Sequence, residues 1–417
     1  MTPRLKWILL VGGLLIALTC GARLWFFPYG IGFSTPPASG EGLSDDALRR
    51  RIHLPPGFAI NVFASGLTMP RMLRFTEAGD LLVSSPSDGA VVLLERDTDG
   101  DGRADGRRVL LDKLNMPHGM VLHDGWLYVA ETDAVLRVRF DPATRQIAGT
   151  PERIIRGLPT SGHWTKTIGI GPDGWLYLSM GSSANVCIEQ DSRRAAITRY
   201  HLDGSGEQRY ATGLRNSVGF AWQPGTGALY ATDNGRDWLG DDFPPCELNR
   251  VVEGGFYGWP FANGDRVPDP DFGKGKDEVI AKSIPPAHAF NAHVAPLGIT
   301  FYTGPSFPER YRGAAFVAQH GSWNRSKKSG YKVVALFFAA DGTIREEDFA
   351  SGFELDNNVI GRPVDVAVGP DGSLYVSDDF SGSIYRLSYG ATYPGTAHRG
   401  FPSLPKGLTI FADPPLP

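Results

Sequence analysis

The stretch Asp173-Gly174-Trp175-Leu176-Tyr177-Leu178 places a glycine turn directly before a short run of aromatic and aliphatic residues. This combination is typical of a β-strand that begins after a tight turn. Five further stretches repeat it, most of them spaced by about 46 to 59 residues. They are Ala78–Val83, Asp124–Val129, Thr226–Ala231, Arg312–Val317 and Asp371–Val376.

This spacing lies in the range of propeller blades, so six copies predict a six-bladed β-propeller of the all-β class. A second strand follows several copies after a short loop, as in Val135–Val138, Ala196–Tyr200, Val333–Leu336 and Ser383–Leu387. Beyond the N-terminal leader, the only helical signal is a short turn over Asp45–Arg51. The alternative is another all-β fold, such as a sandwich, whose strands resemble one another by chance.

The repeat also suggests where the propeller begins and ends. We expect it to span residues 51–390, followed by a C-terminal tail over 391–417. The longest gap between copies contains residues 254–297, which are rich in glycine, proline and aromatic residues. We interpret 254–297 as an insertion between the fourth and fifth blades.

The N-terminus resembles an export signal. Arg4 and Lys6 precede an apolar run from Trp7 to Ala22, which is long enough to direct export and nearly long enough to span a bilayer. The positive charges favour an N-terminus that stays in the cytoplasm. We therefore expect residues 1–28 to form a membrane signal anchor, with a cleaved signal peptide as the alternative, and 29–50 to form a flexible linker. The protein would then face the periplasm, anchored in the inner membrane or released from it.

The bulk composition excludes one class of partner and leaves the redox chemistry open. The formal net charge is −4 with both signs mixed along the chain, which gives no basis for nucleic-acid binding. Of the three cysteines, Cys20 lies in the leader. Cys187 and Cys246 could form a disulfide outside the cytoplasm or remain as two thiols.

Five loops that border predicted blade strands carry more polar residues than a turn requires. They are Leu158–Lys166, Thr212–Phe220, Asp233–Asp242, Gln319–Arg325 and Gly361–Asp365. An arginine beside an asparagine, as in Arg215-Asn216, could place a guanidinium against an anion or a carbonyl. The oxygen-rich loop Asp233–Asp242 is suited to Ca²⁺, although a solvated acidic loop has the same composition.

A separate acidic loop alternates carboxylates with other residues. Asp97, Asp99, Asp101 and Asp105, interrupted by glycines, resemble the first part of an EF-hand loop. The closing glutamate of that motif is missing, because Arg108 stands in its place. We predict a structural Ca²⁺ here, in a loop of the first blade and away from the substrate.

At these motifs the chain resembles the pyrroloquinoline quinone (PQQ)-dependent glucose/sorbosone, or sugar, dehydrogenases, and most closely their sorbosone dehydrogenase-like branch. The resemblance covers roughly Leu54 to Tyr389. Its most specific parts are Gly213–Asn216, Asp233–Gly235, Glu247–Asn249, Gly254–Pro260 and His293–Gly298.

The resemblance implies a role for several residues around a quinone bound on one face of the propeller. His163 matches the catalytic base. The matches to cofactor-binding residues are Arg215, Asn216, His320 and Arg362. The backbone carbonyls of Gly235 and Arg236 match those that hold a Ca²⁺ under the cofactor. The chain departs from the soluble glucose dehydrogenases at Val218 and Val364, where that branch has a glutamine and a second arginine, and at His320 or Gly321, where it has a lysine.

The implied function is oxidation of an aldose or a related alcohol, with PQQ and Ca²⁺ as cofactors and a periplasmic or membrane electron acceptor. Two other functions fit the same architecture: a Ca²⁺-dependent lactonase or esterase, and an anchored propeller that binds a glycan or a protein partner without catalysis.

Overall fold

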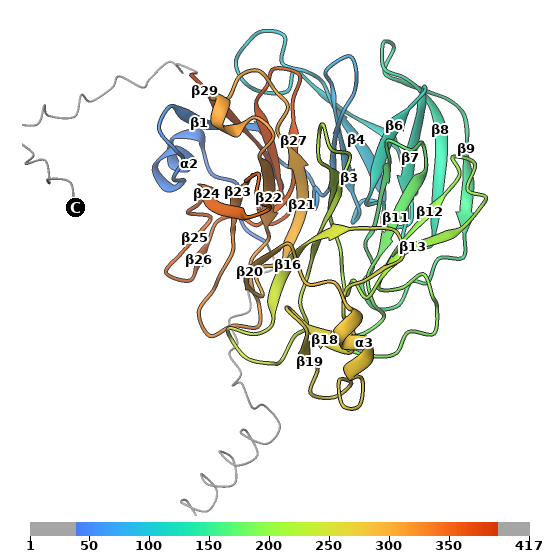
Figure 1. The fold of residues 1–417 in the computed structure, drawn as a ribbon. Helices are drawn as coiled ribbons and strands as arrows, with labels where there is room; N and C mark the ends of the chain where they lie inside the picture. The colour runs from blue at the N-terminus through green and yellow to red at the C-terminus, as the bar shows by residue number, and fades with distance from the viewer. Residues whose placement is uncertain (1–38, 391–417) are drawn as a thin grey trace, which may run out of the picture.

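The computed structural model describes residues 39–390, which form a six-bladed β-propeller (Figure 1). Six antiparallel sheets surround a central axis, and the innermost strand of each sheet contacts the innermost strands of both neighbours. The contact between the last and the first of these strands closes the ring. The predicted fold is therefore confirmed.

The blades follow one another along the chain, and each runs from the axis outward. Blade 1 consists of β2 (Leu73–Phe75), β3 (Leu81–Ser85), β4 (Ala90–Leu94) and β5 (Arg107–Leu111). Blade 2 consists of β6 (Met120–His123), β7 (Trp126–Ala130), β8 (Ala134–Asp141) and β9 (Gln146–Arg156). Blade 3 consists of β10 (Lys166–Ile170), β11 (Leu176–Met180), β12 (Ala196–Tyr200) and β13 (Gln208–Thr212).

The second half of the ring repeats this order. Blade 4 consists of β14 (Phe220–Trp222), β15 (Leu229–Asp233), β16 (Pro245–Val251) and β20 (His288–Ala292). Blade 5 consists of β21 (Pro296–Phe301), β22 (Ala315–Gln319), β23 (Lys332–Phe338) and β24 (Ile344–Ala350). Blade 6 consists of β27 (Pro363–Val368), β28 (Leu374–Asp378), β29 (Ser383–Tyr389) and β1 (Phe58–Ala64). Smaller elements are the one-turn helix η1 (Glu309–Tyr311) and the hairpin of β25 (Glu354–Leu355) and β26 (Asn358–Val359).

The six sequence repeats all lead into the second strand of a blade. Their glycines have φ between +68° and +91°, a conformation that residues with a β-carbon rarely adopt. The strands that follow are buried along almost their whole length, whereas most of β5 and β9 is exposed. A blade packs against a neighbour on both faces near the axis and diverges from it at the rim, which explains this gradient.

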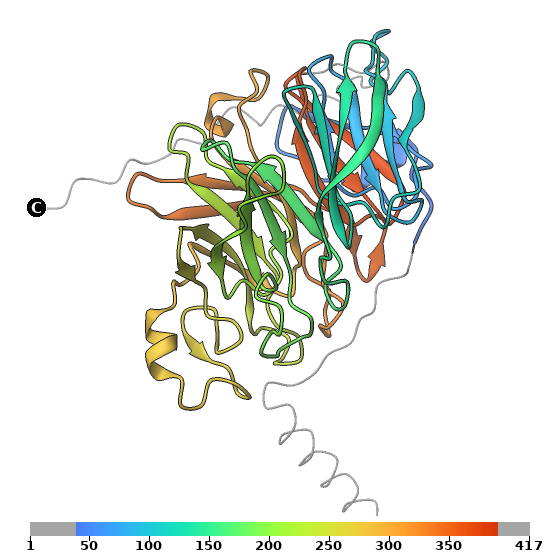
Figure 2. The ribbon, with the colours of Figure 1, turned by 90° about the vertical axis from the view of Figure 1, so that its right-hand side faces the viewer.

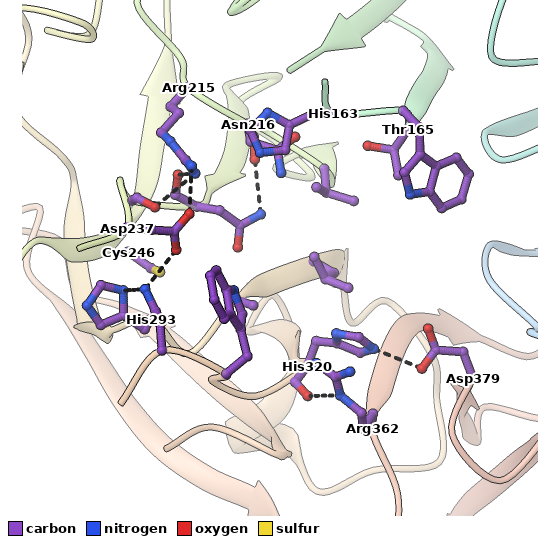
Figure 3. A pocket seen from close by; sticks show the side chains of 18 of the residues that line it. His163, Thr165, Arg215, Asn216, Asp237, Cys246, His293, His320, Arg362 and Asp379 are labelled. Carbon is purple, nitrogen blue, oxygen red and sulfur yellow. Dashed lines mark hydrogen bonds and ion pairs between the residues drawn. The ribbon is translucent and has the colours of Figure 1, made fainter. Parts of the chain in front are cut away.

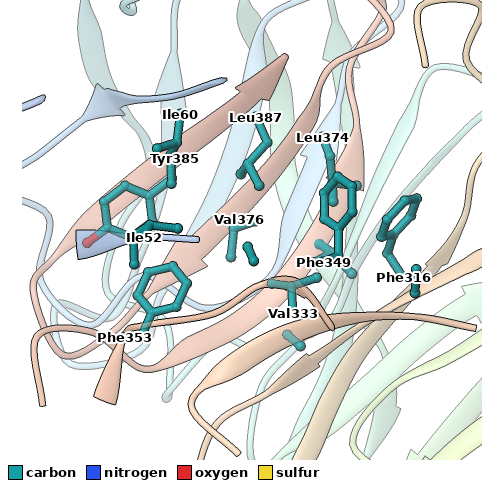
Figure 4. Close-up of a cluster of buried hydrophobic side chains, with 14 of the residues drawn as sticks. Ile52, Ile60, Phe316, Val333, Phe349, Phe353, Leu374, Val376, Tyr385 and Leu387 are labelled. Atoms are coloured by element: carbon teal, nitrogen blue, oxygen red, sulfur yellow. The ribbon is translucent and has the colours of Figure 1, made fainter. Parts of the chain in front are cut away.

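The N-terminal strand completes the last blade. β1 pairs antiparallel with β29, so the two ends of the described chain lie in one sheet. The helix α2 (Asp45–Arg51), capped by Ser44, packs against β1 and buries Leu48. Figure 4 shows the core at this seam, where Ile60 lies with Tyr385 and other apolar side chains of blades 5 and 6. The prediction of a flexible linker over 29–50 is therefore wrong for its last residues.

The predicted insertion lies within the fourth blade and not after it. β20 pairs with β16 as the outer strand of blade 4, so the additional segment connects the third and fourth strands of that blade. It carries β17 (Gly255–Phe256), β18 (Ala262–Asn263), β19 (Val267–Pro268) and α3 (Asp277–Lys282), and it extends away from the ring (Figures 1 and 2). β17 adds to the outer edge of blade 3. The repeat pattern could not reveal this, because an outer strand carries no glycine-turn motif.

The predicted signal anchor (1–28) and C-terminal tail (391–417) lie outside the described residues. Within residues 39–390, no helix has the length and apolar character needed to cross a bilayer.

Candidate functional site

A pocket of about 480 Å³ opens at one end of the propeller axis. Its walls come from the loops that precede the innermost strands β2, β10, β14 and β27, and from the loops that follow β15, β22 and β28. Of the residues that sequence analysis selected, His163, Arg215, Asn216, Gly235, His320 and Arg362 all line it (Figure 3). Residues up to 199 positions apart in the chain are thus brought together by ring closure.

His163 stands on the pocket wall with one ring nitrogen held by the protein. Its Nδ1 lies 2.9 Å from the carbonyl oxygen of Ser182 and 3.0 Å from the Ser182 hydroxyl, which itself donates to Ala184. Nδ1 therefore carries the proton, and Nε2 is left with a lone pair. Burial, assisted by the positive charge of Arg215, lowers the pKa of His163 to about 4. The imidazole is neutral at physiological pH and can accept a proton at Nε2.

The loop that carries His163 is held by a buried guanidinium. Arg194 donates to the carbonyls of His163 and Gly181 at 3.0 Å, to Pro159 at 2.9 Å, and to Ser161. Burial lowers the pKa of Arg194 from its usual value, although the charges of Glu189 and Asp191 oppose this shift. Arg194 could not be selected from the sequence, because it lies outside all five polar loops.

Arg215 uses all its donors inside the protein. Nε donates to the backbone carbonyl of Asn185, and Nη2 donates to the side-chain oxygen of the same residue. Nη1 donates to the carbonyls of Asn234 and Gly235 at 3.1 and 2.9 Å. Nη2 also forms an ion pair with Asp237 at 3.0 Å. These bonds account for the five N–H groups of a guanidinium. Arg215 thus fixes the loop after β15 and contributes positive charge to the pocket.

Three asparagine side chains at the pocket have unused acceptors. The Oδ1 atoms of Asn216, Asn234 and Asn324 are buried and have no hydrogen-bond partner among the described residues. Such a group costs free energy unless a ligand or water satisfies it. Three of them in one pocket indicate a surface shaped for a polar ligand.

The opposite wall contains His320 and Arg362, which belong to a network with two residues that sequence analysis missed. His320 Nε2 lies 2.8 Å from Asp379, and Arg71 Nη1 lies 2.7 Å from the other oxygen of the same carboxylate. Arg362 donates to the backbone carbonyls of His320 and Gly321. Arg71 and Asp379 lie just before β2 and just after β28, positions equivalent to those of the selected loops, and that equivalence could have identified them.

The two residues proposed to offer carbonyls to Ca²⁺ share a small cavity beside the main pocket. Gly235 and Arg236 both line this cavity of about 20 Å³. Gly235 also lines the main pocket, and Arg236 directs its side chain to Asp269 and Asp271. The Gly235 carbonyl already accepts a hydrogen bond from Arg215, which leaves one lone pair for a cation.

Two buried carboxylates lie beside this small cavity. Asp233 and Glu247 face each other across β15 and β16, and neither forms an ion pair among the described residues. Burial raises the pKa of Asp233 to about 7 and that of Glu247 to about 8. A cation in this cavity would favour the ionised form of both carboxylates, and their oxygens together with the neighbouring carbonyls form a donor set that suits a hard metal ion.

The two departures from the soluble glucose dehydrogenases lie next to each other. Val218 and Val364 pack with Leu297 into a buried apolar cluster near the axis. A valine side chain has no donor to replace the arginine, and Val364 is fully buried behind the pocket. Val218 and Leu297 line the pocket, so this part of its floor is apolar.

The cysteines do not form the disulfide that the sequence left open. Cys187 and Cys246 are free thiols. Cys246 lines the pocket, and burial raises its pKa to about 11. Cys187 contacts Ser183 and Glu189 in the loop before β12.

The acidic loop of blade 1 lies at the far end of the propeller from the pocket. It joins β4 to β5, and it brings carboxylate oxygens of Asp97, Asp99 and Asp105 within 4.8 Å of one another. Asp101 is not part of this group, and its carboxylate accepts the backbone N–H of Arg103 at 2.8 Å. The loop thus lies in blade 1 and away from the pocket, and its occupation by Ca²⁺ stays a prediction.

Comparison with known proteins gives consistent relatives. A family model described as TrAA12-like matches residues 52–244 and 261–390. An uncharacterised protein of Borreliella burgdorferi is 31% identical over 367 residues, which cover 83% of this chain and 93% of that protein. The pyrroloquinoline quinone-dependent pyranose dehydrogenase of Coprinopsis cinerea is 26% identical over 81% of this chain, which spans 54% of that protein.

Solved structures show the same fold. The holo pyranose dehydrogenase PQQ domain from Coprinopsis cinerea superimposes with a TM-score of 0.70 at 23% identity, covering 85% of this chain and 100% of that domain. The PQQ-bound aldose sugar dehydrogenase from Streptomyces coelicolor gives a TM-score of 0.58 at 22% identity, covering 81% and 99%.

Proposed function

The chain belongs to the TrAA12-like family of pyrroloquinoline quinone-dependent oxidoreductases, and we propose that it oxidises a hydroxyl group of an aldose in the pocket around His163. The observation that carries this proposal is the neutral imidazole of His163, fixed by Ser182 and directed into a pocket lined with cationic and amide side chains. The pyranose and aldose dehydrogenases among the relatives support the substrate class.

The residues present fit a planar anionic quinone. The pocket contains three guanidiniums, of Arg71, Arg215 and Arg362, and its volume is typical of cofactor sites. The unsatisfied asparagine acceptors and the apolar floor provide the mixed surface that a flat heteroaromatic group requires. When bound, PQQ would supply the two-electron acceptor for the reaction.

The protein would contribute proton transfer and orientation. Nε2 of His163 takes the proton of the substrate hydroxyl, and Ser182 keeps the ring in the tautomer that permits this. Arg194 holds the backbone on which His163 stands, so the distance from base to substrate is set before binding. Arg215 and Arg362 stabilise negative charge in the pocket.

We also propose two cation sites and a cellular location. A Ca²⁺ near the carbonyls of Gly235 and Arg236 is supported by the uncompensated Asp233 and Glu247. A structural Ca²⁺ at the blade 1 loop is supported by its clustered carboxylates.

Residues 1–28 are proposed to anchor the protein on the periplasmic side of the inner membrane, where electrons would pass to a periplasmic or membrane acceptor. The apolar run and its flanking charges support this.

One assay tests the activity. The purified full-length chain is supplied with PQQ and Ca²⁺, and a panel of aldoses is tested with an artificial electron acceptor. Reduction of the acceptor that requires both sugar and PQQ is the expected result. Turnover that is independent of PQQ, or no turnover with any sugar while lactones are hydrolysed, would contradict the proposal.

A further inference from the structure

The wall formed by Arg71, His320, Arg362 and Asp379 has an excess of positive charge. Although burial opposes it, the neighbouring His320, Arg71 and Arg362 hold the pKa of Asp379 well below its usual range, so this carboxylate is ionised. Burial lowers the pKa of His320 to about 4, and this imidazole is neutral at physiological pH. Two guanidiniums therefore face a single carboxylate.

Arg71 has donors that the protein does not use. Only Nη1 forms a hydrogen bond, to Asp379, and Nε is buried without a partner among the described residues. The residue is 5% exposed, lines the pocket, and its guanidinium lies 5.7 Å from the ring of Trp164. A charged donor in such a position is costly unless something binds it.

Arg362 also forms only long hydrogen bonds through its side chain among the described residues. Its side chain donates only to the carbonyls of His320 and Gly321 among the described residues, at 3.2 and 3.3 Å. The third guanidinium of the pocket, that of Arg215, has no free N–H group. Arg71 and Arg362 are therefore the two guanidiniums able to bind an anionic group of a ligand.

We propose that Arg71, together with Arg362, binds a carboxylate of the quinone cofactor. This rests on the proposed function and adds to it a residue that no sequence motif identified. Because the pocket floor at Val218 and Leu297 is apolar, anion binding is confined to this wall and does not continue across the axis. The free N–H groups of Arg71 and Arg362 supply charge-assisted hydrogen bonds to the carboxylate.

Equilibrium binding tests this without relying on turnover. Apo protein in Ca²⁺ buffer is titrated with PQQ and, separately, with its trimethyl ester, and Kd is read from quenching of tryptophan fluorescence, since Trp164 and Trp323 line the pocket. Wild-type protein is expected to prefer the acid. Arg71→Gln should weaken binding of the acid by about tenfold to a hundredfold and leave binding of the ester nearly unchanged.

Three variants separate ligand binding from a structural role. Asp379→Asn removes the ion pair of Arg71 but keeps its donors, so it should bind the acid at least as tightly as wild type. Arg71→Lys keeps the positive charge but loses the planar guanidinium with its paired N–H groups, so its Kd for the acid should lie between those of wild type and Arg71→Gln. It also serves as the test variant if Arg71→Gln does not fold. Arg107→Gln, at the far end of the propeller, is the control for removal of a surface charge.

The outcomes are distinct. If Arg71→Gln and Arg71→Lys bind the acid as wild type does, or lose affinity for acid and ester equally, the inference is wrong while the proposed function stands. It is also wrong if Asp379→Asn reproduces the defect of Arg71→Gln. If wild-type protein binds no PQQ and oxidises no sugar, the proposed function itself fails.

Discussion

Arginine side chains at the two ends of the propeller have different partners. At the far end, Arg145 pairs with the carboxylate of Asp80, and Arg139 lies over the ring of Trp126. At the pocket end, Arg194 and Arg215 donate mainly to backbone carbonyls, and several buried polar atoms have no partner. One end satisfies its polar groups internally, whereas the other leaves hydrogen-bonding capacity for a ligand. This difference distinguishes charged side chains that stabilise the fold from those available to a ligand, although the six blades are alike in architecture.

The largest expected effect follows removal of the base. His163→Ala should reduce turnover with PQQ, Ca²⁺ and sugar by about 10²- to 10⁴-fold, because no other group takes the hydroxyl proton at that point. Steady-state rates with an artificial acceptor measure it. His123→Ala at the far end provides the control and should keep its activity. Near-normal turnover of His163→Ala would contradict the role of His163 as the base, and with it the assignment of the reaction to the pocket end.

A smaller loss of activity is expected from substitution of Arg194. Two variants of this residue distinguish the effect of its charge on His163 from its role in holding the His163 loop. Arg194→Gln removes a positive charge that lowers the His163 pKa, so that pKa should rise from about 4. Arg194→Lys keeps the charge but loses the four carbonyl bonds, so turnover should fall by roughly tenfold to a hundredfold through misplacement of the base.

The pH profile reports the first of these changes. Because the base acts when unprotonated, kcat/KM of the wild type should rise with pH through about 4 and then level off. In Arg194→Gln this acid limb should move to higher pH, and in Arg194→Lys it should stay in place. An unmoved limb in Arg194→Gln would show that Arg194 does not act on His163.

The far end should respond in stability. Arg145→Gln leaves the fully buried Asp80 carboxylate without its ion-pair partner between blades 1 and 2. We expect a loss of about 2–3 kcal/mol in the free energy of unfolding, reduced from the range for fully buried pairs because Arg145 is partly exposed. Chemical denaturation measures this, and turnover under native conditions should be unchanged. A variant as stable as wild type would contradict the assignment.

The smallest effect is expected at the acidic loop of blade 1. If it binds Ca²⁺, wild-type protein should gain a few degrees in Tm when Ca²⁺ is added, and Asp97→Asn should lose part of that gain. Turnover should be the same for both, since the loop lies at the far end. Identical Ca²⁺ dependence of Tm in both proteins would exclude this loop as the site.

The sequence alone determined the ring and most of the pocket residues. The glycine turn and the strand after it are local signals, and ring symmetry then places equivalent loops at the same end, which is why His163, Arg215 and Arg362 could be selected together. Only the tertiary structure decided which groups are left unsatisfied. Arg71, Arg194 and Asp379 depend on contacts between distant segments, and so do the pairing of β1 with β29 and the place of the insertion in blade 4. Burial and hydrogen-bond partners are set by such contacts, and no local pattern records them.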